Sequence, residues 1–222
     1  MIFLESKALK KGSLYYIFGL YFFSFEGRDC EMDALKQRIQ KDGKILNGDI
    51  LKVDSFLNHQ IDVAFLNDIG AAFKERFKDC EVTKILTIEA SGIAVGYATS
   101  QFFNNCPIVF AKKGSASNMS EDAYHAPLHS YTRGADFVIS VSKKYLSKDD
   151  KILIVDDFLA NGEALKALLS VVRQAGCQLV GCGIVIEKAY QPGGDMIRKQ
   201  GVRVESLARI AAMSVENGIE FC

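Results

Sequence analysis

The segment ILIVDDFLANGEA, residues 152–164, decides the fold class of this 222-residue chain. Its aliphatic, β-branched run at 152–155 predicts a buried strand. Two acids, Asp156 and Asp157, end that strand, and a turn of small residues opens a helix whose apolar positions continue at helical spacing to Val172. The segment therefore predicts a strand, a loop and a helix in succession.

The same alternation continues on both sides of this segment. We expect strands at 85–88, 107–110, 137–141, 179–186 and 202–207, and helices that begin after the N-cap Asp62, at 92–103 and after Pro192. Between Lys112 and Ser130 the residues are small and polar, which favours a long loop. The pattern predicts a single α/β domain with a mainly parallel sheet and helices on both faces.

The composition excludes some classes of partner. Lys and Arg number 27 and Asp and Glu number 27, so no overall positive charge attracts a nucleic acid. The six cysteines form no CxxC pair and have no histidine at metal-ligand spacing. We expect reduced structural thiols and a cytoplasmic protein.

The N-terminal segment differs from the rest of the chain. Its apolar run at 14–25 is short for a membrane span, and no small-residue cleavage site follows it, so secretion and membrane insertion are not favoured. Met32 opens an amphipathic pattern typical of a chain start. We expect residues 1–31 to be a non-native or disordered extension; a membrane anchor and a docking helix are the alternatives.

The turn after the acids has the chemistry of an anion site. Gly162 lets a ligand approach the backbone, and the free N–H groups and dipole of the following helix favour a phosphate. Asp156 and Asp157 cannot face the same phosphate without repulsion, so they suit sugar hydroxyls or a divalent cation bound to the anion. A phosphorylated sugar is the predicted ligand; the alternative is that the acids cap the helix or lie in solvent.

Two other strand ends carry candidate groups for an anion. Ala90 and Ser91 form a small-residue turn whose N–H groups can meet a phosphate, although an ordinary tight turn has the same residue types. Lys112 and Lys113 open the expected long loop, where their positive charge can neutralise a leaving anion. The alternative is a pair of lysines in solvent.

The strand at 179–186 leads to Lys188 and Tyr190. Lys188 can donate to a carbonyl oxygen of a planar ring, and Tyr190 can stack on that ring. The alternative is a surface cation beside an aromatic that covers the core.

Residues 152–164 resemble the signature of the type I phosphoribosyltransferase family, which consists of an apolar strand, two acids, two apolar residues and a small loop. The resemblance implies that Asp156 and Asp157 address the ribose hydroxyls of phosphoribosyl pyrophosphate as catalytic residues. It further implies that the 5′-phosphate is held by Ala160, Asn161, Gly162, Glu163 and Ala164, and the pyrophosphate by Ala90, Ser91, Lys112 and Lys113. Asn161 replaces the usual Thr, which leaves its own hydrogen bond to phosphate open.

The resemblance also covers cofactor and assembly. It implies a homodimer and Mg²⁺ that binds with phosphoribosyl pyrophosphate, without a metal site made directly by protein ligands.

Residues 51–60 resemble the N-terminal hood of the xanthine phosphoribosyltransferases within this family, and the similarity extends from about Met32 to Ser206. It implies a domain over 32–222 with a small hood, formed mainly by 45–60 and the C-terminal part. Leu51, Asn58, Lys188 and Tyr190 are then the residues expected to bind xanthine. The implied reaction is a step of purine salvage that yields xanthosine 5′-monophosphate and pyrophosphate.

Two other readings stay open. Ala160 stands where the hypoxanthine–guanine enzymes carry a third acid, which argues against that subgroup, but guanine, adenine or orotate remain possible substrates. A regulator that senses phosphoribosyl pyrophosphate without turnover is the other alternative, although residues 1–31 carry no helix-turn-helix pattern.

Overall fold

The computed structural model describes residues 28–47, 49–114, 121–130 and 135–222. The expectation for the N-terminal extension lies, for residues 1–27, outside the described residues. The elements in chain order are α1 (Arg28–Asp42), β1 (Lys44–Leu46), β2 (Ile50–Lys52), the π-helix η1 (Asp54–Asn58), α2 (Val63–Arg76), β3 (Lys84–Ile88), α3 (Ser91–Phe102), β4 (Ile108–Gly114), β5 (Ala123–Ser130), β6 (Ala135–Ser142), the 3₁₀ turn η3 (Lys143–Tyr145), β7 (Lys151–Leu159), α4 (Glu163–Ala175), β8 (Gln178–Lys188), α5 (Gly193–Arg198), β9 (Val204–Ser214) and β10 (Gly218–Phe221).

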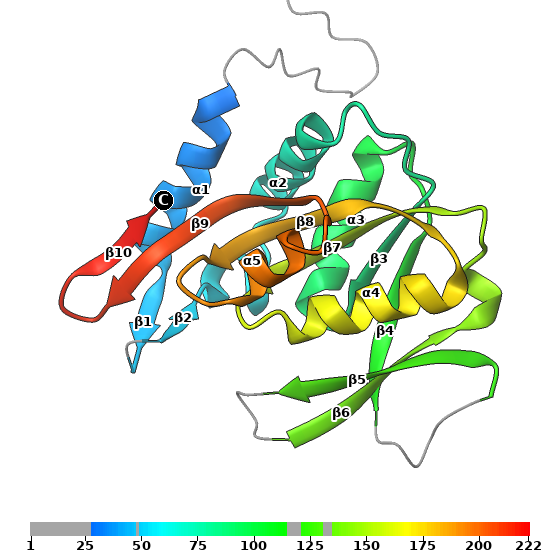
Figure 1. Cartoon of the computed structure of the whole chain (residues 1–222). Coiled ribbons are helices and arrows are strands. Elements are labelled where there is room, and N and C mark those ends of the chain that lie inside the picture. Colours follow the sequence, from blue (N-terminus) through cyan, green and yellow to red (C-terminus); the bar gives the residue numbers. More distant parts are fainter. Residues whose placement is uncertain (1–27, 48, 115–120, 131–134) are drawn as a thin grey trace, which may run out of the picture.

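The main sheet has eight strands in the order β10-β9-β8-β7-β3-β4-β6-β5 (Figure 1). Its centre, from β9 to β4, is parallel. Antiparallel strands complete both edges: β10 on β9, and β6 with β5 beyond β4. β1 and β2 form a separate antiparallel pair. The predicted mainly parallel α/β sheet is confirmed.

Two hydrophobic clusters cover the two faces of this sheet. Alternate residues of β7 point to opposite faces: Leu153 and Val155 join one cluster with α1, α2 and α3, whereas Ile152 and Ile154 join the other with α4. Figure 1 shows α4 on the face of the sheet opposite to α2 and α3. The predicted N-cap of α2 is also confirmed, because the Asp62 carboxylate accepts from the Phe65 N–H at 3.2 Å.

The prediction that the strand ends at residue 155 and that the two acids follow it was wrong. β7 continues to Leu159, so Asp156 and Asp157 lie within it. The two neighbours of β7 explain the difference: pairing with β3 stops at Ile154, but pairing with β8 continues to Leu159, opposite Glu187. The acids therefore begin where β7 separates from β3.

The prediction of a long loop between Lys112 and Ser130 was also wrong in part. β4 extends through Lys112 and Lys113 to Gly114, and residues 123–130 form β5, paired with β6. Ala126 and Leu128 are buried on its inner side. Pro127 between them is tolerated because β5 is an edge strand. Residues 115–120 and 131–134 lie outside the described residues.

The last predicted strand was too short. β9 begins at Val204 and continues to Ser214, since its pairing with β8 extends to Ile210, and β10 follows as a further strand. The C-terminal hairpin and α1 enclose a common cluster, in which Leu35 and Ile39 of α1 pack with Ile210.

Other predictions concern thiols and membranes. The described cysteine side chains, Cys80, Cys106, Cys177, Cys182 and Cys222, are free. Within the described ranges, no helix combines the length and apolarity needed to cross a membrane.

Candidate active site

The crevice of the sheet lies between β3 and β7. From β3 the chain passes through α3 to β4 on one side, and from β7 it passes through α4 to β8 on the other. Connections that diverge in this way open a crevice at the carboxyl ends of the two strands, where ligands of parallel sheets bind. Three predicted segments meet here: the acids of β7, the start of α3 and the start of α4.

Asp156 is the buried acid of this crevice. Its side chain is 5% exposed, and its Oδ1 accepts a 3.1 Å hydrogen bond from the Asp157 N–H. Burial raises the pKa of Asp156 well above its ordinary value, the nearby Asp157 carboxylate adds to this shift, and Lys113 opposes it. The site thus favours the neutral form of Asp156 more than water does, and a ligand that hydrogen-bonds or neutralises the carboxylate offsets the cost of ionisation.

The start of α3 lies against Asp156. Ala90 is the N-cap and Ser91 the first helical residue. A Cβ placed on Gly92 would lie 2.1 Å from Thr87 Oγ1 and 3.0 Å from Asp156 Oδ1, so this turn accepts no side chain there. Thr87 Oγ1 is buried without a hydrogen-bond partner. The Thr87 hydroxyl and Asp156 therefore both border the first turn of α3.

Lys112 and Lys113 lie in β4, opposite Ser140 and Ile139 of β6. Both side chains are exposed. The Lys113 N–H donates at 2.6 Å to the carboxylate of Glu89, which follows β3. β4 thus holds this lysine pair beside the end of β3, although not at the start of a long loop as predicted.

The small-residue turn of residues 160–162, called the 160–162 loop below, connects β7 to α4. Gly162 is the N-cap of α4 with φ +84°, a left-handed conformation that favours glycine. Glu163 opens the helix, and its carboxylate accepts from Lys166 Nζ at 2.7 Å. The first N–H groups of α4, like those of any helix, have no acceptor within the helix, and they lie at the end of the crevice.

Lys188 and Tyr190 meet the tip of the β1–β2 hairpin. Lys188 Nζ donates to the Asp49 carbonyl oxygen, and the Tyr190 hydroxyl donates to Asp49 Oδ1 at 2.9 Å. Gln191 Nε2 donates to the same Oδ1 at 3.1 Å. Burial lowers the pKa of Lys188, and Asp49 partly opposes this shift. Asp49 is therefore a shared partner of three side chains at the end of β8 and just after it.

The two remaining predicted residues are placed differently from each other. Leu51 is 6% exposed and packs into the cluster under α1 and α2. Asn58 is exposed at the end of η1, next to the buried Phe56 and Leu57. Among the described residues, no hydrogen bond joins Asn58 to Lys188 or Tyr190.

Sequence reasoning did not single out Asp49, Thr87, Gly193 or Gly194. Asp49 follows the Asn-Gly pair at 47–48, a hairpin-turn signal that predicts the turn but not its contact with Lys188. The Gly193 N–H donates to the Ala160 carbonyl at 3.1 Å, so the start of α5 lies against the 160–162 loop. The adjacent glycines after Pro192 were the available signal for such a close approach.

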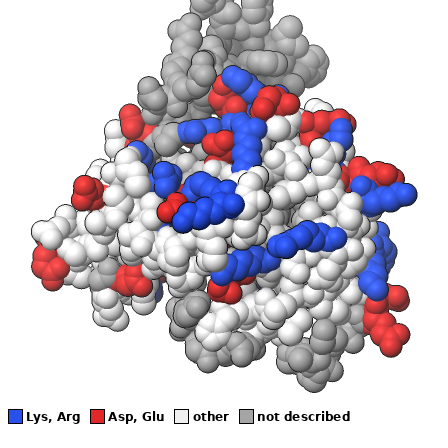
Figure 2. Space-filling view, in the orientation of Figure 1, with Lys and Arg blue, Asp and Glu red and all other residues white. Residues whose placement is uncertain are grey.

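The side chains of the described residues also bear on metal binding and surface charge. Within the described part of the chain, no group of three or more His, Cys, Asp or Glu side chains is placed to hold a metal ion. Figure 2 shows basic side chains over the middle of one face, with acidic side chains beside several of them.

The sequence matches the model of the phosphoribosyl transferase domain over residues 55–207. It is 54% identical over 187 residues to the xanthine phosphoribosyltransferase of Clostridioides difficile (strain 630), an alignment that covers 84% of this chain and 97% of that protein. It is 51% identical over 190 residues to the xanthine phosphoribosyltransferase of Laribacter hongkongensis (strain HLHK9), with 86% of this chain and 100% of that protein covered.

Solved structures share the fold at lower sequence identity. The adenine phosphoribosyltransferase of Giardia lamblia, complexed with 9-deazaadenine, superposes with a TM-score of 0.67 at 20% identity, over 79% of this chain and 97% of that one. The Trypanosoma brucei adenine phosphoribosyl transferase, in complex with AMP, pyrophosphate and ribose-5-phosphate, gives 0.67 at 19% identity, over 83% of each chain. The chain therefore belongs to the phosphoribosyltransferase family, in the group that contains the bacterial xanthine phosphoribosyltransferases.

Proposed function

We propose that this protein transfers the 5-phosphoribosyl group of phosphoribosyl pyrophosphate to xanthine, giving xanthosine 5′-monophosphate and pyrophosphate in purine salvage. The observation that carries the proposal is the crevice between β3 and β7, where the buried Asp156, the start of α3 and the 160–162 loop lie together. The choice of xanthine as the base rests on the relatives that are 54% and 51% identical, which are named xanthine phosphoribosyltransferases.

The phosphates bind at the two helix starts in this proposal. The 160–162 loop with Glu163 and Ala164 holds the 5′-phosphate, because the first N–H groups of α4 have no acceptor within the helix. Ala90 and Ser91 hold the pyrophosphate at the start of α3 in the same way. The exposed Lys112 and Lys113 in the adjacent β4 supply positive charge for the leaving pyrophosphate.

Asp156 and Asp157 act on the sugar. Their carboxylates accept hydrogen bonds from the ribose hydroxyls and favour the positive charge that develops on the ribose as the pyrophosphate departs. Mg²⁺ arrives as part of the substrate, bound to phosphoribosyl pyrophosphate, where it neutralises charge on the leaving group. The chain's own contribution is to hold the anomeric carbon and the base nitrogen in line at a fixed distance.

The base binds between the end of β8 and the hood, which consists mainly of residues 45–60 and the C-terminal part. Lys188 donates to a xanthine carbonyl oxygen, Tyr190 stacks on the ring, and Asn58 with Leu51 completes the pocket from the hood. The link between Asp49 and the 188–191 segment supports this arrangement, because it joins the hood hairpin to the two β8-side residues.

Pyrophosphate release tests the proposal. The protein is supplied with Mg²⁺, phosphoribosyl pyrophosphate and one of xanthine, guanine, hypoxanthine or adenine, and we expect xanthine to give the highest kcat/KM. Asp157→Ala abolishes release, whereas Asp149→Ala, which removes an exposed acid from the turn before β7, leaves it unchanged. Preference for another base would refute the xanthine assignment, and tight binding of phosphoribosyl pyrophosphate without turnover would refute the enzyme.

We also propose a homodimer in the cytoplasm. Support for a second copy comes from apolar side chains that α3 and β4 leave exposed, Tyr97 at 64%, Phe102 at 38% and Phe110 at 38%. The free thiols of the described cysteines suit a reducing compartment. Sedimentation of the purified protein tests the dimer, and Tyr97→Ser is expected to shift it toward monomer.

A further inference from the structure

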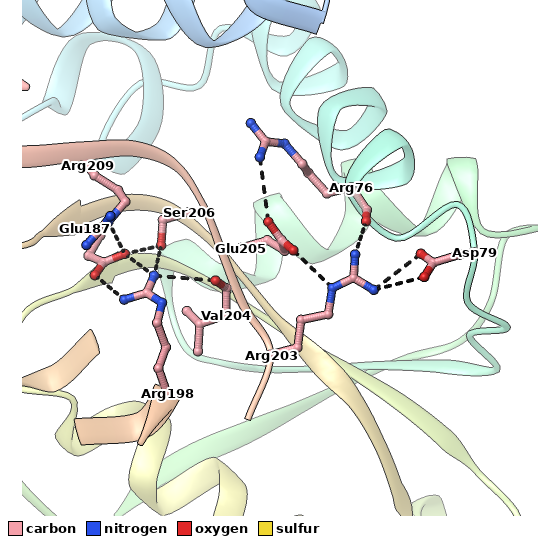
Figure 3. A network of polar contacts seen from close by, with 9 residues as sticks. All are labelled: Arg76, Asp79, Glu187, Arg198, Arg203, Val204, Glu205, Ser206 and Arg209. Atoms are coloured by element: carbon pink, nitrogen blue, oxygen red, sulfur yellow. Dashed lines mark hydrogen bonds and ion pairs between the residues drawn. The ribbon is translucent and has the colours of Figure 1, made fainter. Parts of the chain in front are cut away.

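Glu187 is a buried carboxylate directly before Lys188 in β8. Its side chain is 1% exposed, and both oxygens are occupied: Arg198 Nη1 donates to Oε1 at 2.7 Å and Arg198 Nη2 to Oε2 at 2.6 Å (Figure 3). The Ser206 hydroxyl also donates to Oε2. Burial alone raises the pKa of Glu187, but the bonds from Arg198 and Ser206 outweigh it, so its pKa lies below the ordinary value. Glu187 is thus held as a charged group.

Arg198 ends α5, a helix too short to be stable by itself. α5 has six residues, and its buried positions are Gly193, Gly194 and Ile197, so a single apolar side chain packs it onto the sheet. The two charge-assisted hydrogen bonds to Glu187 are the strong polar link between α5 and β8. This ion pair therefore fixes where α5 lies.

The start of α5 lies directly between Glu187 and the 160–162 loop. A Cβ on Gly194 would lie 2.1 Å from Glu187 Oε1, and a Cβ on Gly193 would lie 2.2 Å from the Ala160 carbonyl oxygen. The site for a Cβ on Gly162 is 3.0 Å from Gly193 Cα. These contacts leave no room for adjustment, so a shift of α5 displaces the loop.

We propose that Glu187 and Arg198 are positioning residues for the transfer reaction: their ion pair presses the glycine start of α5 against the 160–162 loop and holds that loop in the conformation that binds the 5′-phosphate. The proposal rests on the proposed function of this loop. Neither residue touches the substrate; each acts through the backbone of Gly193 and Gly194.

Ribose 5-phosphate is the probe that separates this role from catalysis, because it needs the 5′-phosphate site but neither base nor pyrophosphate. Arg198→Met keeps most of the aliphatic length and removes the guanidinium. We expect it to weaken ribose 5-phosphate binding, measured by calorimetry, by about tenfold or more, since small displacements of a binding group have large effects. In turnover, KM for phosphoribosyl pyrophosphate rises by a similar factor, whereas KM for xanthine changes less. Arg198→Lys restores part of the lost affinity for ribose 5-phosphate.

Arg203→Met is the matched control. Arg203 also makes several hydrogen bonds, to Asp79, Glu205 and the Arg76 carbonyl, in a partly exposed network that does not include α5 (Figure 3). It also stacks on Phe77, with 4.8 Å to the ring centroid. It therefore reports the effect of losing an arginine with several hydrogen bonds at a position away from α5. We expect Arg203→Met to bind ribose 5-phosphate as the unaltered protein does.

Equal ribose 5-phosphate affinity for Arg198→Met and Arg203→Met, at a temperature where both are folded, would overturn the proposal. If Arg198→Met does not fold, Arg198→Met combined with Glu187→Gln replaces it, because the buried carboxylate that has lost both Arg198 hydrogen bonds is then neutral. The remaining cation near it, Arg209 with its Nε 3.4 Å from Glu187 Oε2, has a side chain 42% exposed to solvent. The proposed function fails separately: absence of xanthine-dependent turnover in the unaltered protein refutes the enzyme, while the ribose 5-phosphate comparison still decides the role of the ion pair.

Discussion

The Tyr190 hydroxyl donates a 2.9 Å hydrogen bond to Oδ1 of Asp49, a residue 141 positions earlier in the chain. Gln191 donates to the same oxygen, and Lys188 donates to the Asp49 carbonyl. One residue at the tip of a hairpin thus holds the 188–191 segment at the end of β8. In the proposed enzyme this segment forms one wall of the base pocket.

Asp49→Ala removes the carboxylate but keeps the carbonyl that Lys188 contacts. Tyr190 and Gln191 lose their common acceptor, so the wall is less ordered when xanthine binds. We expect KM for xanthine to rise by about threefold to tenfold, the equivalent of roughly one hydrogen bond. KM for phosphoribosyl pyrophosphate stays unchanged, and initial-rate kinetics with each substrate varied in turn measure both.

Asp54→Ala is the control for this prediction, because Asp54 is an exposed acid nearby in the chain that pairs with Lys52 at 3.6 Å. We expect neither variant to change the melting temperature much, since ion pairs of exposed groups contribute little to stability. A rise in both KM values for Asp49→Ala would contradict this prediction, because the hairpin tip would then support the whole site and not the base pocket alone.

Asp156→Asn tests the buried acid through the pH dependence of stability. The folded-state pKa of Asp156 lies well above 3.8. The contribution of protonated Asp156 to the free energy of unfolding is therefore complete below about pH 4 and is lost as pH rises through the folded-state pKa. Asparagine does not titrate. The variant should therefore gain free energy of unfolding relative to the unaltered protein as pH rises through the folded-state pKa of Asp156.

Urea unfolding at a series of pH values measures this difference. Asp157→Asn serves as the second variant, because removal of the neighbouring charge should lower the pKa of Asp156 and reduce the pH effect. Both substitutions are expected to lower kcat by about a hundredfold or more if the carboxylates act on the developing charge. A constant stability difference at all pH values would mean that Asp156 does not titrate in this range.

The order and type of the central elements could be predicted because local patterns determine them. The run of Ile152 to Val155, the spacing of apolar residues in α4 and the Asp62 cap each specify their element from neighbouring residues alone. β5 was missed because Pro127 lies inside it and a proline argues against a strand, and only the position of β5 at the sheet edge makes Pro127 acceptable.

The candidate site was predicted less completely, for a physical reason. That Asp156 lies within β7 depends on how far two neighbouring strands pair with it, which a single strand's sequence does not contain. The contacts of Asp49 with Tyr190 and of Gly193 with Ala160 join separate segments, so only tertiary packing brings them together. Residue types could indicate the ligand chemistry, but not which backbone supports the loop.

Thiol reactivity should follow burial. Burial raises the pKa of the Cys182 thiol to about 12, whereas Cys222 is exposed at the end of the chain. At pH 8 only about one in ten thousand Cys182 side chains is then a thiolate, the form that reacts. With a chromogenic disulfide reagent we expect Cys222→Ser to remove a fast phase, and Cys182→Ser to change only the slow phase that accompanies unfolding. A fast phase that is lost in Cys182→Ser would contradict the buried position.

Gly162 and Gly176 offer a matched pair, one at each end of α4. Both have positive φ, +84° and +70° respectively, so alanine is strained at either position. They differ in what a new methyl group would meet. At Gly162 it would lie 3.0 Å from Gly193 Cα, whereas at Gly176 the nearest atom is Lys148 Cβ at 3.9 Å.

Gly162→Ala and Gly176→Ala should each lower the free energy of unfolding by about 1 kcal/mol or more, because both pay the left-handed strain. Only Gly162→Ala should also raise KM for phosphoribosyl pyrophosphate, by about tenfold, since its methyl group pushes the 160–162 loop away from α5. Urea unfolding and initial-rate kinetics on the same samples measure the two effects. If Gly176→Ala raised this KM equally, loss of stability and not displacement of the loop would explain the defect, and the assignment of the 5′-phosphate to the start of α4 would lose its support.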